Sequence, residues 1–210
     1  MYKPQCKASA IDNDPSAIVT VQSILYDYYV NNHLWKINDD NPSGIRIKKN
    51  KLQKIIVDDY DAISTWFSAM TNKDVHACAR LCREDNECLL EIERYPNAQK
   101  KLAHIFEKKK QLNLVELNRE AIQPKDVQNV YVYLSLLQAV FKHCVLYKNS
   151  ILTTSNLDEW VKVYDLIKFP KMVGSEFKYT DLDEKEVNVY FASQNQIKNI
   201  LARINLLLQE

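Results

Sequence analysis

The stretch PKDVQNVYVYLSLLQAVFKHCVLYK, residues Pro124–Lys148, decides the predicted fold because neither side of it is polar. One seam at helical spacing comprises Val127, Val130, Leu134, Leu137, Phe141 and Cys144. The opposite side carries Val132, Tyr133, Leu136 and Val140. A helix that is apolar all round is buried. The stretch therefore predicts a central helix over residues 124–148, with the rest of the chain wrapped around it.

Amphipathic segments on both sides supply neighbours for this helix. Asp14 and Pro15 are typical of the N-cap and first positions of a helix, which we place at residues 15–32. Ser155 caps a later helix that Pro170 ends, and an apolar stripe at helical spacing runs from Ser193 to the C-terminus. Further helical segments are predicted over residues 50–57, 74–95, 97–110 and 112–122. Residues 182–192 fit either a helix or a strand.

The fold predicted from these patterns is mainly α, a multi-helix bundle that forms a single domain over residues 1–210. One small β-hairpin is expected near residues 34–47, and a break at residues 71–73 is the place where two sub-lobes would meet. This layout is similar to Bcl-2-like helical bundles, including those of some viral host-modulating proteins. No family motif accompanies the similarity, and architecture alone does not assign a function.

Glycine is scarce, with only Gly44 and Gly174 in 210 residues. Walker A loops, dinucleotide-binding loops and nucleophile elbows each need two or more glycines close together, so the sequence excludes all three. Abundant lysine, asparagine and isoleucine indicate an AT-rich genome, which accounts for part of the scarcity. The formal net charge of +1 gives no overall field that would attract nucleic acid or membranes.

The sequence predicts an intracellular protein, cytoplasmic or nuclear. The first sixteen residues lack the apolar core of a secretory signal. The longest uncharged run is too short and too polar to span a bilayer. Five cysteines without a secretory context are typical of reduced thiols.

Several local clusters are candidates for chemical sites. On a helix, Cys78 and Cys82 would share one face and could both contact a metal, although small buried core residues are the favoured interpretation and metal binding stays open. The neighbours His76 and Cys88 fall off that face. The turn 39–45 lacks the glutamate of a calcium loop. The carboxylates of Asp58, Asp59 and Asp61 are best explained as helix caps, and the adjacent pair His143 and Cys144 do not face each other on a helix.

Two lysine-rich segments predict an alternative function in binding RNA or DNA. They would present to phosphates Arg46, Lys48, Lys49, Lys51, Lys54, Lys108, Lys109 and Lys110. Trp35 and Tyr60, near the first segment, could stack on bases.

The leading prediction is a non-enzymatic helical module for protein–protein interaction, as in a viral or host-modulating factor. Its partner, another protein or a second copy of the chain, would contact the C-terminal stripe through Ile197, Leu201, Ile204 and Leu208. No catalytic residue, cofactor, metal ligand or small-molecule substrate is identified, and no membrane association is expected.

Overall fold

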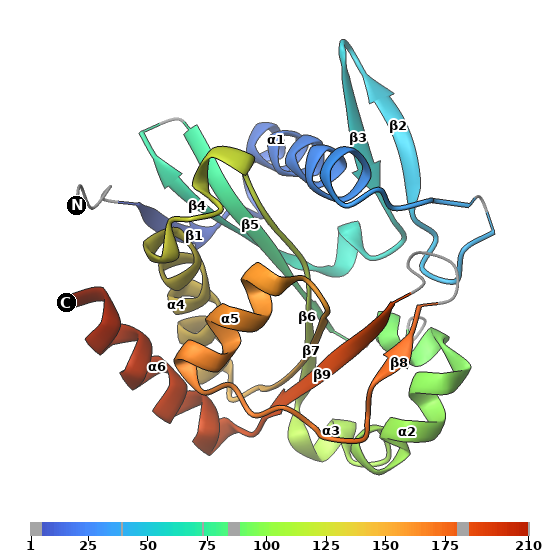
Figure 1. Ribbon diagram of the computed structural model, residues 1–210, viewed down its shortest axis with the longest axis vertical. Helices are drawn as coiled ribbons and strands as arrows, with labels where there is room; N and C mark the ends of the chain where they lie inside the picture. The colour runs from blue at the N-terminus through green and yellow to red at the C-terminus, as the bar shows by residue number, and fades with distance from the viewer. Residues whose placement is uncertain (1–5, 39, 73, 84–88, 180–184, 210) are drawn as a thin grey trace.

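The computed structural model describes residues 6–38, 40–72, 74–83, 89–179 and 185–209. Within these residues the fold is mixed α/β and is built on a seven-stranded sheet with the order β1-β4-β5-β6-β7-β9-β8 (Figure 1). The strands are β1 (Lys7–Ala10), β4 (Thr65–Thr71), β5 (Asp74–Arg83), β6 (Leu114–Ile122), β7 (Ser150–Ser155), β8 (Phe177–Lys178) and β9 (Glu186–Ala192). Strands β6 and β7 are parallel, and the other neighbours are antiparallel.

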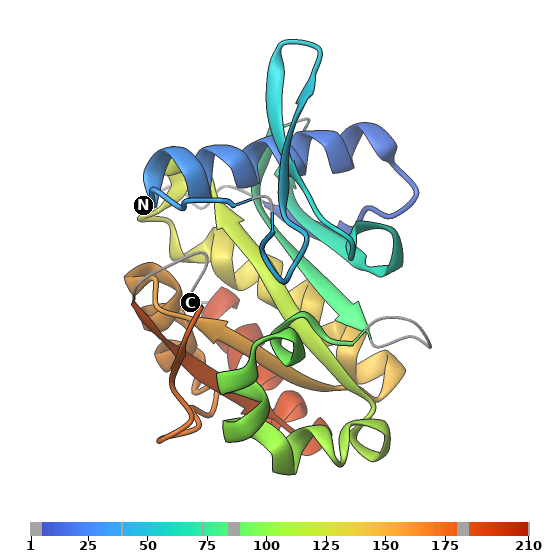
Figure 2. The ribbon, with the colours of Figure 1, turned by 90° about the vertical axis from the view of Figure 1, so that its right-hand side faces the viewer.

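Helices cover both faces of this sheet (Figures 1 and 2). One face carries α4 (Val130–Tyr147), α5 (Asp158–Ile167) and α6 (Gln194–Gln209). The other face carries α1 (Pro15–Leu25), its π-helical extension η1 (Tyr26–Asn32), α2 (Pro96–Phe106) and the short α3 (Lys109–Leu112). Asp14 caps α1 as predicted, because its carboxylate accepts the backbone N–H groups of Ser16 and Ala17.

The predicted mainly α multi-helix bundle is wrong, and the error lies in the segments predicted as helices at residues 50–57, 74–95 and 112–122. Their described parts contain strands β3 (Gln53–Val57), β5 and β6. Most residues of β5 and β6 are buried, so neither strand shows the alternation of a half-buried strand. A largely apolar run without alternation has the same periodicity signal as a buried helix segment.

Helix α4 is buried as the sequence predicts, but it is not the centre of a helical bundle. It packs on strands β1, β4 and β5 and against α6. Residues 124–126, which were predicted to start the helix, form a separate 3₁₀ turn, η4 (Pro124–Asp126). By length and composition α4 could cross a membrane; the core helix of a soluble protein has the same character, and here α4 lines the main core.

The predicted hairpin is displaced along the chain. The observed hairpin joins β2 (Arg46–Asn50) to β3 and forms a separate two-stranded sheet, so it shares only residues 46 and 47 with the predicted range. The proposed break at residues 71–73 falls at the turn between the paired strands β4 and β5, where Lys73 lies outside the described residues. The ambiguous segment 182–192 forms strand β9 over its described part.

The apolar stripe of α6 packs inside the molecule, which gives a test of the fold. Replacing the fully buried Ile204 by valine removes one methylene, and we expect the free energy of unfolding to fall by about 1 kcal/mol. Thermal denaturation would register this as a midpoint lowered by about 2–4 °C. Leu206 on the same helix is 62% exposed, so Leu206→Val is the matched control and should leave the midpoint nearly unchanged.

Candidate active site

The most distinctive feature of the sheet is a bulge in β6. Asn118 pairs with Arg80 and Ala121 pairs with Cys78, so two residues of β6 lie opposite Ala79 alone. Arg119, one of these two, has a left-handed backbone with φ +53°. Such a conformation costs an arginine about 1–3 kcal/mol, and it persists only where the surroundings enforce it. β-Bulges of this kind re-aim side chains beside functional sites.

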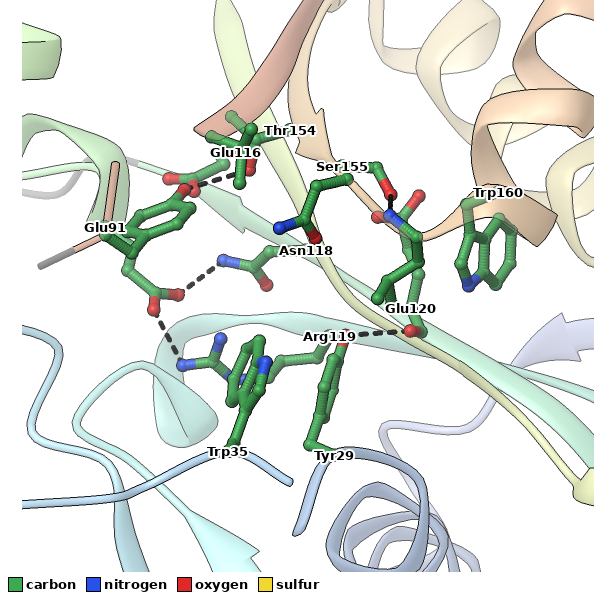
Figure 3. A pocket seen from close by; sticks show the side chains of 14 residues that line it. Tyr29, Trp35, Glu91, Glu116, Asn118, Arg119, Glu120, Thr154, Ser155 and Trp160 are labelled. Carbon is green, nitrogen blue, oxygen red and sulfur yellow. Dashed lines mark hydrogen bonds and ion pairs between the residues drawn. The ribbon is translucent and has the colours of Figure 1, made fainter. Parts of the chain in front are cut away.

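At the bulge, strand β6 separates from β7. Their parallel pairing runs from Leu114 opposite Ser150 to Leu117 opposite Thr153 and is not continued by the described residues beyond it. The gap between the separated strands is a small cavity of about 60 Å³. Its lining comes from β6 (Glu116, Asn118, Arg119, Glu120), from the end of β7, the segment after it and α5 (Thr154, Ser155, Asn156, Leu157, Trp160), and from Tyr29, Trp35, Glu91, Tyr179 and Val187 (Figure 3).

A buried ion cluster holds the bulge in place. The guanidinium of Arg119 donates to Asp58 at 2.8 and 3.0 Å and to Glu91 at 2.7 Å. Arg80, which is fully buried on β5, donates to Asp58 at 2.5 Å, to Asp61 at 2.9 Å and to Glu91 at 3.3 Å. Asp58 and Glu91 therefore each bind both arginines, and this network compensates the strained backbone of Arg119.

The two aspartates of this cluster differ in their affinity for protons. Burial alone would raise the pKa of Asp58, but Arg80 and Arg119 outweigh it and hold that pKa well below its usual range. Burial and the adjacent charge of Asp58 raise the pKa of Asp61 to about 6. Asp58 is therefore a permanent anion between two cations, while Asp61 titrates close to neutrality.

Glu116 projects into the same cavity from β6 and has an unusual affinity for protons. Burial, followed by the nearby charge of Glu91, raises the pKa of Glu116 to about 8. Its carboxyl group accepts a hydrogen bond from the backbone N–H of Ile92 at 3.2 Å. A carboxyl group with a pKa near the working pH can exchange protons with a bound substrate, which is the requirement for a general base.

The raised pKa of Glu116 predicts a direct spectroscopic observation. In protein labelled with ¹³C at glutamate carboxyl groups, one resonance should titrate near pH 8 and should be missing from the Glu116→Gln variant. Because the folded chain binds this proton more tightly than the unfolded chain, Glu116 should contribute less to stability as pH rises from 4.5 towards 8. A carboxyl spectrum in which every glutamate titrates below pH 6 would contradict the assignment.

A second buried carboxyl group, Glu120, forms the floor beside Trp160. Burial raises the pKa of Glu120 well above its usual value. One of its oxygens accepts from the Thr153 hydroxyl at 3.3 Å, and the other has no hydrogen-bond partner among the described residues. The Tyr29 hydroxyl donates to the backbone carbonyl of Glu120 at 2.8 Å, and the ring of Tyr29 stacks on Trp35 at 4.0 Å (Figure 3).

A groove approaches the cavity region on the face that carries α4 and α5. It is lined at the start of α4 by Val127, Gln128, Val130 and Tyr133, and along α5 by Asp158, Glu159, Lys162, Val163 and Leu166. Tyr133 contacts Trp160 with ring centroids 4.8 Å apart, and Trp160 in turn lines the cavity. An extended ligand lying in the groove could therefore direct one end towards the gap between β6 and β7.

The structure does not bring the two predicted lysine groups together. Arg46, Lys48 and Lys49 lie on β2, Lys51 in the following turn and Lys54 on β3. Lys108, Lys109 and Lys110 lie beside α2 and α3 at the opposite end of the long axis (Figure 1). Lys109 is ion-paired with Glu93 at 2.8 Å. The two aromatic residues proposed for base stacking have other places in the structure. Tyr60 is fully buried, and Trp35 lines the cavity.

The residues of the C-terminal stripe and the thiols lie in the core. Ile197 and Ile204 are buried, and Leu201 and Leu208 are partly buried against the main core. Cys78 and Cys82 are buried on strand β5, and burial raises the pKa of the Cys82 thiol to about 12. No group of residues able to hold a metal ion occurs among the described residues, which exclude Cys88 and Asp39. His76 instead contacts Asp126 at 2.8 Å.

Sequence reasoning missed Arg80, Glu116, Arg119 and Glu120, and it explained Asp58 and Asp61 as helix caps. One signal was present. Arg80 interrupts the apolar run ACARLC, and charged residues interrupt the run LVELNREAI in β6. Charges inside apolar runs are costly unless they are paired, so they indicate a buried network.

None of the protein-family models matches the chain, and no curated protein matches it. Solved structures do show the same fold. FeeM, an N-acyl amino acid synthase from uncultured soil microbes, superposes with a TM-score of 0.63 at 12% identity over 98% of each chain. BjaI, a CoA-dependent acyl-homoserine lactone synthase solved with SAM and isopentyl-CoA, has a TM-score of 0.58 at 13% identity, over 95% of this chain and 90% of its own.

An acetyltransferase of the GNAT family from Staphylococcus aureus Mu50 has a TM-score of 0.51 at 14% identity, over 89% of this chain and 99% of its own. These likenesses correct the functional predictions as well as the fold. The non-enzymatic helical interaction module and the viral host-modulating factor depended on a helical bundle, and the absence of a small-molecule substrate depended on the lack of a recognised catalytic cluster. The three solved proteins named above are described as two synthases and an acetyltransferase.

Proposed function

We propose that the chain is an acyltransferase that moves an acyl group from a thioester donor to the nitrogen of an amine. One observation carries the proposal. The parallel strands β6 and β7 separate at a bulge, and the gap holds a buried carboxyl group, Glu116, with a pKa of about 8. The descriptions of FeeM as an N-acyl amino acid synthase and of BjaI as a CoA-dependent acyl-homoserine lactone synthase support the same class of reaction.

In the proposed reaction the amine nitrogen attacks the carbonyl carbon of the thioester. Ionised Glu116 removes the proton that the attacking nitrogen must lose, which is general base catalysis. A carbon–nitrogen bond forms and the carbon–sulfur bond breaks, so that the sulfur leaves and is protonated to a thiol. The products are an amide and one equivalent of thiol, without any change in oxidation state.

The separated strands can stabilise the transition state of this reaction. Beyond Leu117 the edge of β6 that faces β7 is not engaged in the parallel ladder. Backbone N–H groups on such an edge can donate to the oxygen of the reacting carbonyl as negative charge develops on it. The donor's extended arm would lie in the groove between the start of α4 and α5, where Lys162 supplies an exposed cation for a phosphate.

The acidic lining of the cavity favours an amine as the acceptor. Glu91 and Glu116 face it together with one arginine, Arg119, whose charge is already matched by Asp58 and Glu91. The carboxylate of Glu116, once ionised, attracts a protonated amine to the buried site. The amine releases one proton to solvent before it attacks, and Glu116 then takes the proton that the attacking nitrogen loses.

A thiol-release assay tests the proposal. The full chain is mixed with acyl-CoA thioesters of increasing chain length, with and without a panel of primary amines and amino acids. We expect thiol release that requires both a donor and an amine. Release that does not depend on any amine would indicate hydrolysis and contradict amine transfer, and no release with any pair would contradict the function as a whole.

An intracellular location completes the proposal. Acyl thioesters are made inside cells, and the four described cysteines, Cys6, Cys78, Cys82 and Cys144, are free thiols, as is typical of a reducing compartment.

A further inference from the structure

The β2–β3 hairpin projects from the body of the molecule, away from the seven-stranded sheet (Figures 1 and 2). Among the described residues, its two strands pair only with each other, from Arg46 opposite Val57 to Asn50 opposite Gln53. The inner part of β3 is anchored, because Ile55 and Ile56 are buried. The outer part is exposed, and the proposed acyl transfer assigns it no role.

The charge on this hairpin is neither balanced nor paired at its outer end. Residues 46–54 contain basic residues and no acidic residue. At the base, Arg46 is paired with Asp59 at 2.8 Å, and Lys54 donates to the Tyr26 hydroxyl at 3.2 Å. Within the described residues, the exposed side chains of Lys48, Lys49 and Lys51 have no hydrogen bond or ion pair.

Two features of the outer end are unfavourable for the isolated protein. Lys49 lies directly opposite Lys54, and like charges in that position destabilise a pair of strands. Leu52, in the turn, is 97% exposed to water. An anionic surface would relieve the repulsion, and an apolar layer behind that surface would accommodate the leucine. A single kind of ligand, an anionic surface with an apolar layer behind it, would therefore relieve both the lysine repulsion and the exposure of Leu52.

We propose that the tip of this hairpin, residues 48–52, docks on an anionic lipid bilayer, with Leu52 in the interfacial layer and the surrounding lysines on lipid phosphates. Lysine side chains suit this arrangement because their apolar stems lie along the layer while the ammonium groups reach the headgroups. Each basic residue near an anionic membrane strengthens binding about fivefold.

Other anionic partners fit the hairpin less well. Proteins that bind single-stranded nucleic acid stack aromatic side chains on the bases, and residues 46–54 contain no aromatic residue. A stable protein partner buries about 800 Å² on each side, whereas this narrow ribbon offers a single fully exposed leucine at its tip. A bilayer requires neither aromatic residues nor a broad complementary face.

Vesicle sedimentation tests the proposal with the full chain. Vesicles of phosphatidylcholine alone are compared with vesicles that contain about 30% phosphatidylglycerol, at about 0.15 M and about 1 M salt. We expect at least tenfold stronger partitioning onto the anionic vesicles, which high salt abolishes. The triple variant K48Q/K49Q/K51Q should lose about 100-fold of that partitioning. Leu52→Ser should lose severalfold and remain sensitive to salt.

The matched control is K100Q/K108Q/K110Q, which removes the same formal charge from exposed lysines at the far end of the molecule. Its partitioning should stay within about threefold of the parent protein. Circular dichroism and thiol release establish that each variant is folded, independently of vesicle binding. Equal binding to both vesicle types, no binding, or an equal loss in the control would overturn the proposal. So would a DNA duplex bound through these lysines by a protein that ignores vesicles.

Discussion

Replacing Glu116 by glutamine is expected to lower kcat/KM for acyl transfer by about 10²–10⁴-fold, because the amide cannot accept the proton of the attacking amine. Glutamine keeps nearly the same shape and can still accept the hydrogen bond that the backbone N–H of Ile92 donates to Glu116. The loss should therefore lie mainly in kcat, with the thermal midpoint at pH 7 little changed, since the native carboxyl group is largely protonated there.

The pH dependence separates a general base from a merely structural carboxyl group. With wild-type protein, kcat/KM should rise with pH and level off above about pH 8, as Glu116 loses its proton. The Glu116→Gln variant should lack that limb of the profile. A variant that keeps activity within about threefold, or that keeps the same pH profile, would show that another group takes the proton.

Removing the charge of Asp58 should have the largest effect on stability. Asp58 accepts from both Arg80 and Arg119, so Asp58→Asn leaves two buried guanidinium groups with too little negative charge. Breaking a buried ion pair from one side costs about 3–5 kcal/mol. For a chain of this size, that corresponds to a thermal midpoint lowered by about 10 °C or more.

Asp59→Asn is the matched control. The Asp59 side chain follows Asp58 in the sequence, is 44% exposed and pairs with Arg46 at the surface. It should change the midpoint by no more than about 2–3 °C. The pKa of Asp58 is depressed by folding, so its contribution is present above the ordinary value of 3.8 and is lost as pH falls further. The difference in thermal midpoint between the wild-type protein and Asp58→Asn should therefore become smaller as pH falls below 3.8. If Asp58→Asn and Asp59→Asn lowered the thermal midpoint equally at pH 7, this would contradict the role of Asp58 in a buried ion cluster.

The sequence allowed those elements to be predicted whose local signals agree with their tertiary setting. Helix α1 begins at Pro15 after a capping Asp14, α2 begins at Pro96, and α4 is apolar on every side. In each case the capping residue or the periodicity depends only on nearby residues. Burial of α4 was also predictable, but what buries it was not, because a helix pattern does not show whether a sheet or other helices cover it.

The sheet and the site were hidden for a common physical reason. Strands β5 and β6 are covered on both faces, so their sequences lack the alternation that reveals a half-buried strand. The site joins Asp58, Arg80, Glu91 and Arg119, which are distant in sequence and meet only when the sheet forms. Neither the bulge at Arg119 nor the pKa of Glu116 has a local sequence signal, since both result from long-range packing.

The gap between β6 and β7 is the proposed place where an acyl group is transferred to an amine. Mass spectrometry of the products tests it most directly, with the full chain, an acyl thioester carrying a ¹³C-labelled carbonyl, and the amine that gives the fastest thiol release. We predict an amide that contains the labelled carbonyl, formed in one-to-one proportion with free thiol and abolished by Glu116→Gln. Labelled free acid as the only product, or no product from any donor and amine, would contradict the account.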